Sequence, residues 1–259
     1  MVAALVVGAG VAIALLVAVR GGTPADTPEV AVGASDEGFT VWARNADGTP
    51  VRWDPCSPIE IVVSDIGSPL GYGGPAFTAD VEAAVATLRE ATGLELSVTG
   101  TTDEVPDAAR STVTADTDGA RRWAPVLIGW RPPGDGGLPL RDVDRGVAVP
   151  IAVGPADARV YVTAQVVLNP EREDLQPGAA DRATSWGATI LHELAHVLGL
   201  GHVDDPDELM HTYPGAGPVR FGPGDLAGLE AVGAGGGCLE VPTPQDLDVV
   251  LPDEHTSSR

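Results

Sequence analysis

The chain has 259 residues, 44% of them hydrophobic, so it is long enough to bury one sizeable core. Its formal net charge is −22, from 37 acidic residues against 15 arginines and no lysine. A field of this sign repels nucleic acid and anionic surfaces, so we expect no DNA or RNA partner.

The N-terminus carries an apolar targeting segment. Residues 2–19 are an unbroken apolar run, followed by Arg20 and a polar, Pro- and Gly-rich linker over 21–38. As a helix, this run would extend roughly 27 Å, enough to cross a bilayer core. A cleaved signal peptide usually begins with a basic residue and none precedes this run, so a transmembrane anchor over 1–20 is favoured over a removed signal. Either alternative exports the chain, to the cell membrane with an extracellular domain or as a secreted protein.

One sizeable domain is expected over residues 39–240. Its first part is predicted to consist of strands and one helix. A strand is expected near 59–64, and a helix should run from Thr78 as its N-cap to about Glu90. The apolar face of this helix would consist of Val81, Ala84, Val85 and Leu88. Further strands are expected over 94–100, 124–130, 146–153 and 159–168, whereas the polar stretch 101–120 lacks periodicity and predicts a loop.

The second part of the domain is predicted to be mainly helical. From about Ala183 an apolar stripe recurs at helical spacing, formed by Trp186, Ile190, Leu194 and Val197. A final helix is expected to begin with Asp225 as its N-cap. The tail over 241–259 is Pro-rich and acidic, and such a composition predicts disorder.

The segment HELAHVLGLGH, which begins at His192, is the most specific part of the sequence. On a helix His192 and His196 stack one turn apart, so they can bind one metal ion together. Gly199 can end the helix and turn the chain back, so that His202 supplies a third imidazole. Glu193 points to the side, beside a metal-bound water. Three neutral nitrogens with a fourth position open are typical of a catalytic zinc site, whereas solvated or core histidines rarely share this spacing.

This spacing, HExxHxxGxxH, resembles that of the metzincin zinc peptidases. Met210 in DELMH follows the third histidine by eight residues, an interval similar to that of the Met-turn in the matrixins, the branch containing the matrix metalloproteinases. The resemblance covers roughly residues 50–235, and its specific part is 192–210. It implies an α+β catalytic domain with a twisted, mostly parallel five-stranded sheet, an antiparallel edge strand and an active-site helix.

The resemblance also implies an activity. The chain would be a monomeric zinc metalloendopeptidase that hydrolyses peptide bonds of extracellular proteins through a zinc-activated water, with Glu193 as general base. Its one zinc ion would be held by His192, His196 and His202, with Met210 as an apolar floor beneath them. The peptide substrate would lie extended beside an edge strand, for which residues 147–153 are the best candidate. Two alternatives are a zinc-retaining module that binds without turnover and a zinc hydrolase of non-peptide amides.

Several positions depart from the matrixin pattern. No histidine precedes His192, so a second, structural zinc held by histidines is excluded. Tyr213 follows Met210 by three residues rather than two, which favours a wall of the substrate pocket over a fifth metal ligand. His211 is either cleft-facing or solvated. Calcium, which matrixins often carry, remains an alternative at the acidic pairs Asp142 with Asp144 and Asp204 with Asp205, although no EF-hand spacing is present.

The two cysteines stand at the two ends of the expected domain. Cys56 precedes the first strand and Cys238 follows the last helix, so they are expected to form one disulfide that closes the fold. The alternative is a cysteine switch, in which a propeptide thiolate of a matrixin zymogen holds the zinc. That motif resembles PRCGxPD, whereas this chain has DPCSPIE after almost no propeptide.

Overall fold

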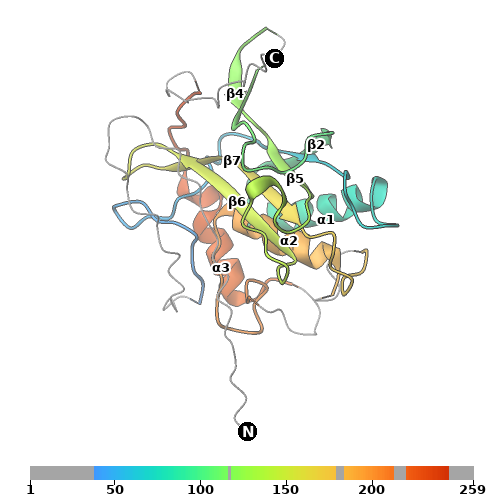
Figure 1. The fold of residues 1–259 in the computed structure, drawn as a ribbon. Coiled ribbons are helices and arrows are strands. Elements are labelled where there is room, and N and C mark those ends of the chain that lie inside the picture. Colours follow the sequence, from blue (N-terminus) through green and yellow to red (C-terminus); the bar gives the residue numbers. More distant parts are fainter. Residues whose placement is uncertain (1–37, 116–117, 179–183, 213–219, 245–259) are drawn as a thin grey trace.

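The computed structural model describes residues 38–115, 118–178, 184–212 and 220–244 (Figure 1). The predicted anchor over 1–20 and the linker up to residue 37 lie outside the described residues. Among the described residues, no helix combines the length and the apolar character that a membrane span needs.

The described chain forms an α+β fold around a five-stranded sheet with the strand order β2-β1-β5-β7-β6. The strands are β1 (Ile59–Val63), β2 (Leu96–Thr101), β5 (Val126–Trp130), β6 (Gly146–Val153) and β7 (Val160–Leu168). Neighbouring strands pair in parallel, except that β6 runs antiparallel to β7 at the edge of the sheet. The predicted fold class, including the antiparallel edge strand, is therefore confirmed.

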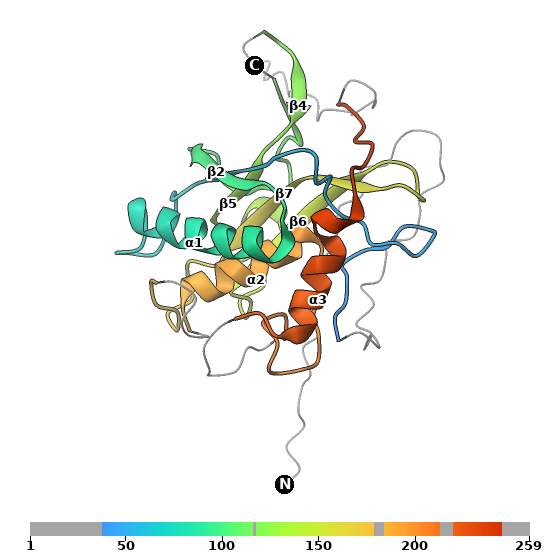
Figure 2. The same ribbon diagram turned by 180° about the vertical axis from the view of Figure 1, so that it is seen from behind.

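The described residues also form three α-helices, namely α1 (Pro75–Thr92), α2 (Trp186–Leu198) and α3 (Pro223–Val232). Helices α1 and α2 contact each other and cover one face of the sheet (Figure 2). On the other face, the loop residues Leu138 and Leu140 pack against apolar side chains of β6 and β7. All residues of β5 and β7 are therefore buried, which explains why both sequences are mostly apolar.

The starts of α1 and α3 differ from the prediction. Helix α1 has Gly74 as its N-cap and Pro75 as its first residue, whereas the Thr78 hydroxyl donates back to the Gly74 carbonyl at 3.1 Å. Asp225 is likewise not an N-cap but the third residue of α3, which follows Gly222. In both helices a proline begins the first turn, because its fixed φ suits that position and its missing N–H needs no partner there.

The prediction of a loop over 101–120 is also partly wrong, because this range contains a strand. β3 (Val113–Ala115) pairs antiparallel with β4 (Arg121–Trp123) in a separate two-stranded sheet. Strands of three residues are too short to leave a periodic pattern. The remaining elements are the short 3₁₀ turns η1 (Asp135–Gly137) and η2 (Ala234–Gly236).

The start of the C-terminal tail lies against this small sheet. The Trp123 indole N–H donates to the Pro242 carbonyl at 2.9 Å. The rest of the tail predicted to be disordered, residues 245–259, lies outside the described residues.

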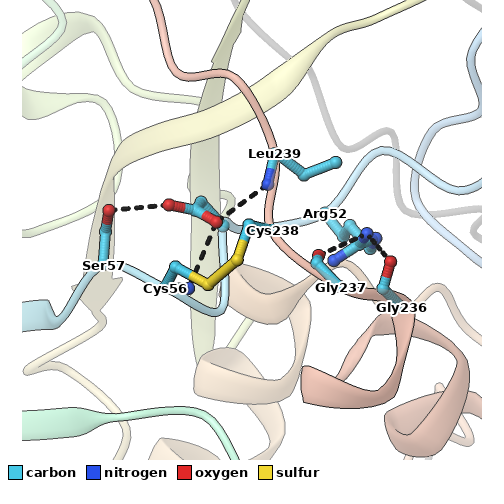
Figure 3. Close-up of a disulfide and its surroundings, with 8 residues drawn as sticks. Arg52, Cys56, Ser57, Gly236, Gly237, Cys238 and Leu239 are labelled. Carbon is cyan, nitrogen blue, oxygen red and sulfur yellow. Dashed lines mark hydrogen bonds between the residues drawn. A yellow bond between two sulfur atoms is a disulfide. The ribbon is translucent and has the colours of Figure 1, made fainter.

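The predicted disulfide between Cys56 and Cys238 is present, with the two Cα atoms 5.4 Å apart (Figure 3). Asp54 reinforces the junction, since one of its carboxylate oxygens accepts from the backbone N–H of Cys56 at 3.1 Å and of Leu239 at 2.9 Å. Arg52 donates to two carbonyls of the glycine-rich segment just before Cys238. Because Cys56 has no free thiol, the cysteine-switch alternative is excluded.

Candidate metal centre

Helix α2 presents two of the three predicted ligands. Its N-cap is Ser185, whose hydroxyl accepts from the Ala188 backbone N–H at 3.1 Å. The predicted apolar stripe is buried in the core, and it comprises Trp186, Ile190, Leu194 and Val197. This packing fixes the rotation of the helix, so that His192 and His196 project together from its other side, with ring centroids 4.7 Å apart.

Gly199 ends α2 in the left-handed conformation, with φ 111°. An added Cβ at this residue would lie 3.2 Å from the Tyr161 ring and 3.2 Å from the Val51 carbonyl, so both the turn and the packing require glycine. The chain reverses here and brings His202 back over the helix, where its ring centroid is 4.6 Å from that of His196.

An N-terminal segment over 38–42 fastens the loop that carries the third histidine. Trp42 donates its backbone N–H to Gly199 at 2.7 Å, and Gly201 donates to the Thr40 carbonyl at 2.9 Å. The Thr40 hydroxyl donates to the carbonyl of His202 itself at 2.6 Å. This contact could not be predicted from the sequence, because a hydrogen bond to a backbone carbonyl 162 residues away leaves no local pattern.

The three imidazoles converge through their Nε2 atoms. His202 Nε2 lies 3.2 Å from His192 Nε2 and 3.1 Å from His196 Nε2. The Nδ1 atoms of His192 and His196 lie 2.8 Å from the Leu209 carbonyl and 2.7 Å from the Leu200 carbonyl. A carbonyl only accepts, so these Nδ1 atoms carry the hydrogens and both Nε2 atoms present lone pairs.

This arrangement fits a zinc ion. Tetrahedral ligands at the usual Zn–N distance of about 2.05 Å are about 3.3 Å apart, close to the separations between these nitrogens. At most one hydrogen on His202 Nε2 could be shared among the three atoms, whereas one cation would satisfy every lone pair. The two backbone carbonyls also supply the outer hydrogen bonds that metal-ligating histidines typically make.

The electrostatics keep these histidines neutral. Burial lowers the pKa of His192 to about 3, with the neighbouring His202 as the next cause. Burial likewise lowers the pKa of His202 to about 4 and that of His196 well below its ordinary value. Neutral imidazole is the form that binds a metal, so the site is already in its ligating state near neutral pH.

Glu193 lies between the histidines and the edge strand, with only 6% of its surface exposed. The pKa of Glu193 is raised to about 8, first by burial and then by the negative charge of Asp144, while a hydrogen bond from the Ala148 backbone opposes the rise. An added Cβ at Gly146, the first residue of β6, would lie 3.0 Å from the Glu193 side chain. The candidate base therefore sits directly against the start of the edge strand.

Other predicted site residues have different outcomes. Met210 is fully buried in the core, Tyr213 lies outside the described residues, and His211 is half-buried. Among the described residues, the one other group with metal-ligand spacing contains the disulfide-bonded cysteines, and no cluster supports calcium. Asp144, one of the calcium candidates, forms an ion pair with Arg141 at 2.6 Å.

No protein-family model matches the chain, and a search of curated proteins finds no match. The three converging imidazoles and the buried carboxylate beside them therefore carry the functional interpretation by themselves.

Proposed function

We propose that this chain is a zinc-dependent metalloendopeptidase of the metzincin type, similar to the matrixins. The observation that carries the proposal is the convergence of three Nε2 atoms within 4.8 Å of one another, on the HExxH helix and the turn that follows it. Glu193 on the same helix supplies the one buried carboxylate that the sequence places next to a ligand.

The chemistry needs a base that can take up a proton and release it again. A bound zinc ion would lower the pKa of a water molecule and polarise the scissile carbonyl. Glu193 accepts the proton of that water and passes it to the leaving amine. Burial is the largest cause that raises the pKa of Glu193 to about 8, which strengthens it as a proton acceptor, and the charge of a bound zinc ion would keep it ionised.

The edge strand offers the place for an extended substrate. β6 is antiparallel to β7, and within the described part of the chain the outer side of β6 has no strand partner. An extended peptide can pair with such an edge through its backbone, which positions it independently of most of its side chains. Because Gly146 of β6 touches Glu193, a peptide on this edge passes directly beside the base.

The disulfide supports an exported protein. Such bonds persist in oxidising compartments and are rare in the cytosol, so we propose an extracellular domain, anchored in the membrane through residues 2–19 or secreted. We further propose that it acts as a monomer on peptides or proteins.

A peptide-library assay tests the proposed activity. The purified chain is incubated with the library with and without a chelator, alongside the Glu193→Gln variant and, as a control, Glu82→Gln at an exposed position of α1. We expect cleavage that the chelator abolishes. Glu193→Gln should retain zinc and lose a factor on the order of 10² to 10⁴ in rate, because the amide cannot take a proton. Glu82→Gln should behave like the wild type.

The same assay separates the alternatives. Zinc binding without cleavage of any peptide would indicate a non-catalytic binding module. Hydrolysis of simple N-acyl amides alone would indicate a non-peptide amidase. Cleavage by zinc-loaded Glu193→Gln at the wild-type rate would show that Glu193 is not the base.

A further inference from the structure

Two buried carboxylates lie between the turn at Met210 and the start of α3. Glu208 is 7% exposed and Asp225 is 1% exposed. Neither group takes part in the proposed reaction, and neither was assigned a role in the metal site from the sequence.

Glu208 caps the N-terminus of α3. Its two carboxylate oxygens accept separately from the backbone N–H groups of Gly224 and Asp225, each at 2.8 Å. Free N–H groups at a helix N-terminus stabilise a negative charge. The first turn of α3 is shaped for this carboxylate, because an added Cβ at Gly222 would clash with it.

Asp225 makes the reverse connection, from α3 to the turn. Its carboxylate accepts from the backbone N–H of Leu209 at 2.5 Å and of Met210 at 3.3 Å, and also from Gly222 at 3.2 Å. Each carboxylate therefore holds the backbone of the segment that carries the other. We call Glu208 and Asp225 the carboxylate clamp.

The residues whose N–H groups this clamp holds, Leu209 and Met210, also accept hydrogen bonds through their carbonyl groups at the metal centre. The Leu209 carbonyl accepts from His192 Nδ1 at 2.8 Å. The Met210 carbonyl accepts from the backbone N–H of Val203 at 3.1 Å, next to His202. The clamp thus holds the N–H groups of Leu209 and Met210. The carbonyls of the same two residues hold His192 directly and His202 through its neighbour Val203.

We propose that Glu208 and Asp225 are positioning residues of the metal centre, which set the orientation of His192 and His202 through the Leu209–Met210 turn. The inference rests on the metal site of the proposed function, and it is independent of peptide hydrolysis. Hydrogen bonds one step removed from a metal orient its ligands, and losing one typically weakens metal affinity 10- to 100-fold.

The test compares Asp225→Asn and Glu208→Gln with the wild-type chain. The matched control is Asp207→Asn, which removes the same charge at an exposed residue adjacent to Glu208. Three quantities are measured: the zinc dissociation constant by chelator competition, the visible spectrum of the cobalt(II) form, and the urea unfolding of the metal-free protein. We expect both clamp variants to bind zinc about 10- to 100-fold more weakly, with an altered cobalt spectrum, and the control to match the wild type.

The outcomes are distinct. Both clamp variants could keep the wild-type zinc affinity and cobalt spectrum and differ only in a less stable metal-free protein. This result would overturn the inference and leave capping of α3 as the sole role of the clamp. If Asp225→Asn does not fold, Glu208→Gln decides, because its amide oxygen still accepts one of the two bonds. A wild-type chain that binds no zinc would overturn the proposed function together with this inference.

Discussion

Removing the disulfide should reduce stability by a predictable amount. Cys56 and Cys238 are 182 residues apart in the sequence, so the bond closes most of the described chain into one loop. In the chain-entropy account, a loop of this length lowers the free energy of unfolding by about 5 kcal/mol when the bond is lost. The loss should be at or below this value, because Asp54 and Arg52 still hold the same junction by hydrogen bonds.

Urea unfolding of the double variant Cys56→Ser/Cys238→Ser measures this loss. The comparison with the wild type is made in the presence of a chelator, so that metal binding does not contribute to the difference. We expect a clearly lower midpoint, while zinc stoichiometry stays unchanged because neither cysteine is among the three proposed ligands. An unchanged midpoint, or two free thiols titrating in the native wild-type protein, would refute the reasoning.

Three further predictions concern the site. Gly199→Ala should lower the unfolding free energy by about 1 kcal/mol or more and weaken zinc binding, since alanine must adopt φ 111° against the Tyr161 ring; urea unfolding and zinc titration check this. Gly146→Val should reduce peptide hydrolysis while zinc content stays at the wild-type level, because the new side chain displaces Glu193; a normal rate would contradict it. Acidification should destabilise the metal-free protein from about pH 6.5 down to about pH 4, because the unfolded chain protonates histidines whose folded pKa values are about 3 and about 4. The stability difference between the wild type and a variant lacking the three histidines, measured at pH 7 and pH 5, isolates this effect.

The parts of the site that are local in sequence could be predicted from it. One helical turn separates His192 from His196, and a glycine that ends the helix is enough to return His202 to them. The edge strand was also predictable, since its apolar and β-branched residues mark β6 at its observed bounds, Gly146–Val153. The disulfide followed from two cysteines at the ends of one domain.

The contacts that the sequence could not predict are long-range and made through the backbone. The Thr40 hydroxyl donates to the His202 carbonyl and His192 Nδ1 donates to the Leu209 carbonyl, but a backbone carbonyl acceptor requires no particular residue type. The residue type and position of Asp225 predict an N-cap, whereas Pro223 sets the helix start and the Asp225 carboxylate binds the backbone of the Leu209 turn. Such contacts depend on the folded positions of α3 and of the N-terminal segment, which no local pattern encodes.

The most direct test of the metal centre is zinc stoichiometry. Metal analysis of the purified wild-type chain should give about one zinc ion per chain, held by the three imidazoles. The triple variant His192→Ala/His196→Ala/His202→Ala should contain none, whereas His211→Ala, with a histidine removed beside the site, should retain it. Wild-type zinc content in the triple variant would contradict the central claim.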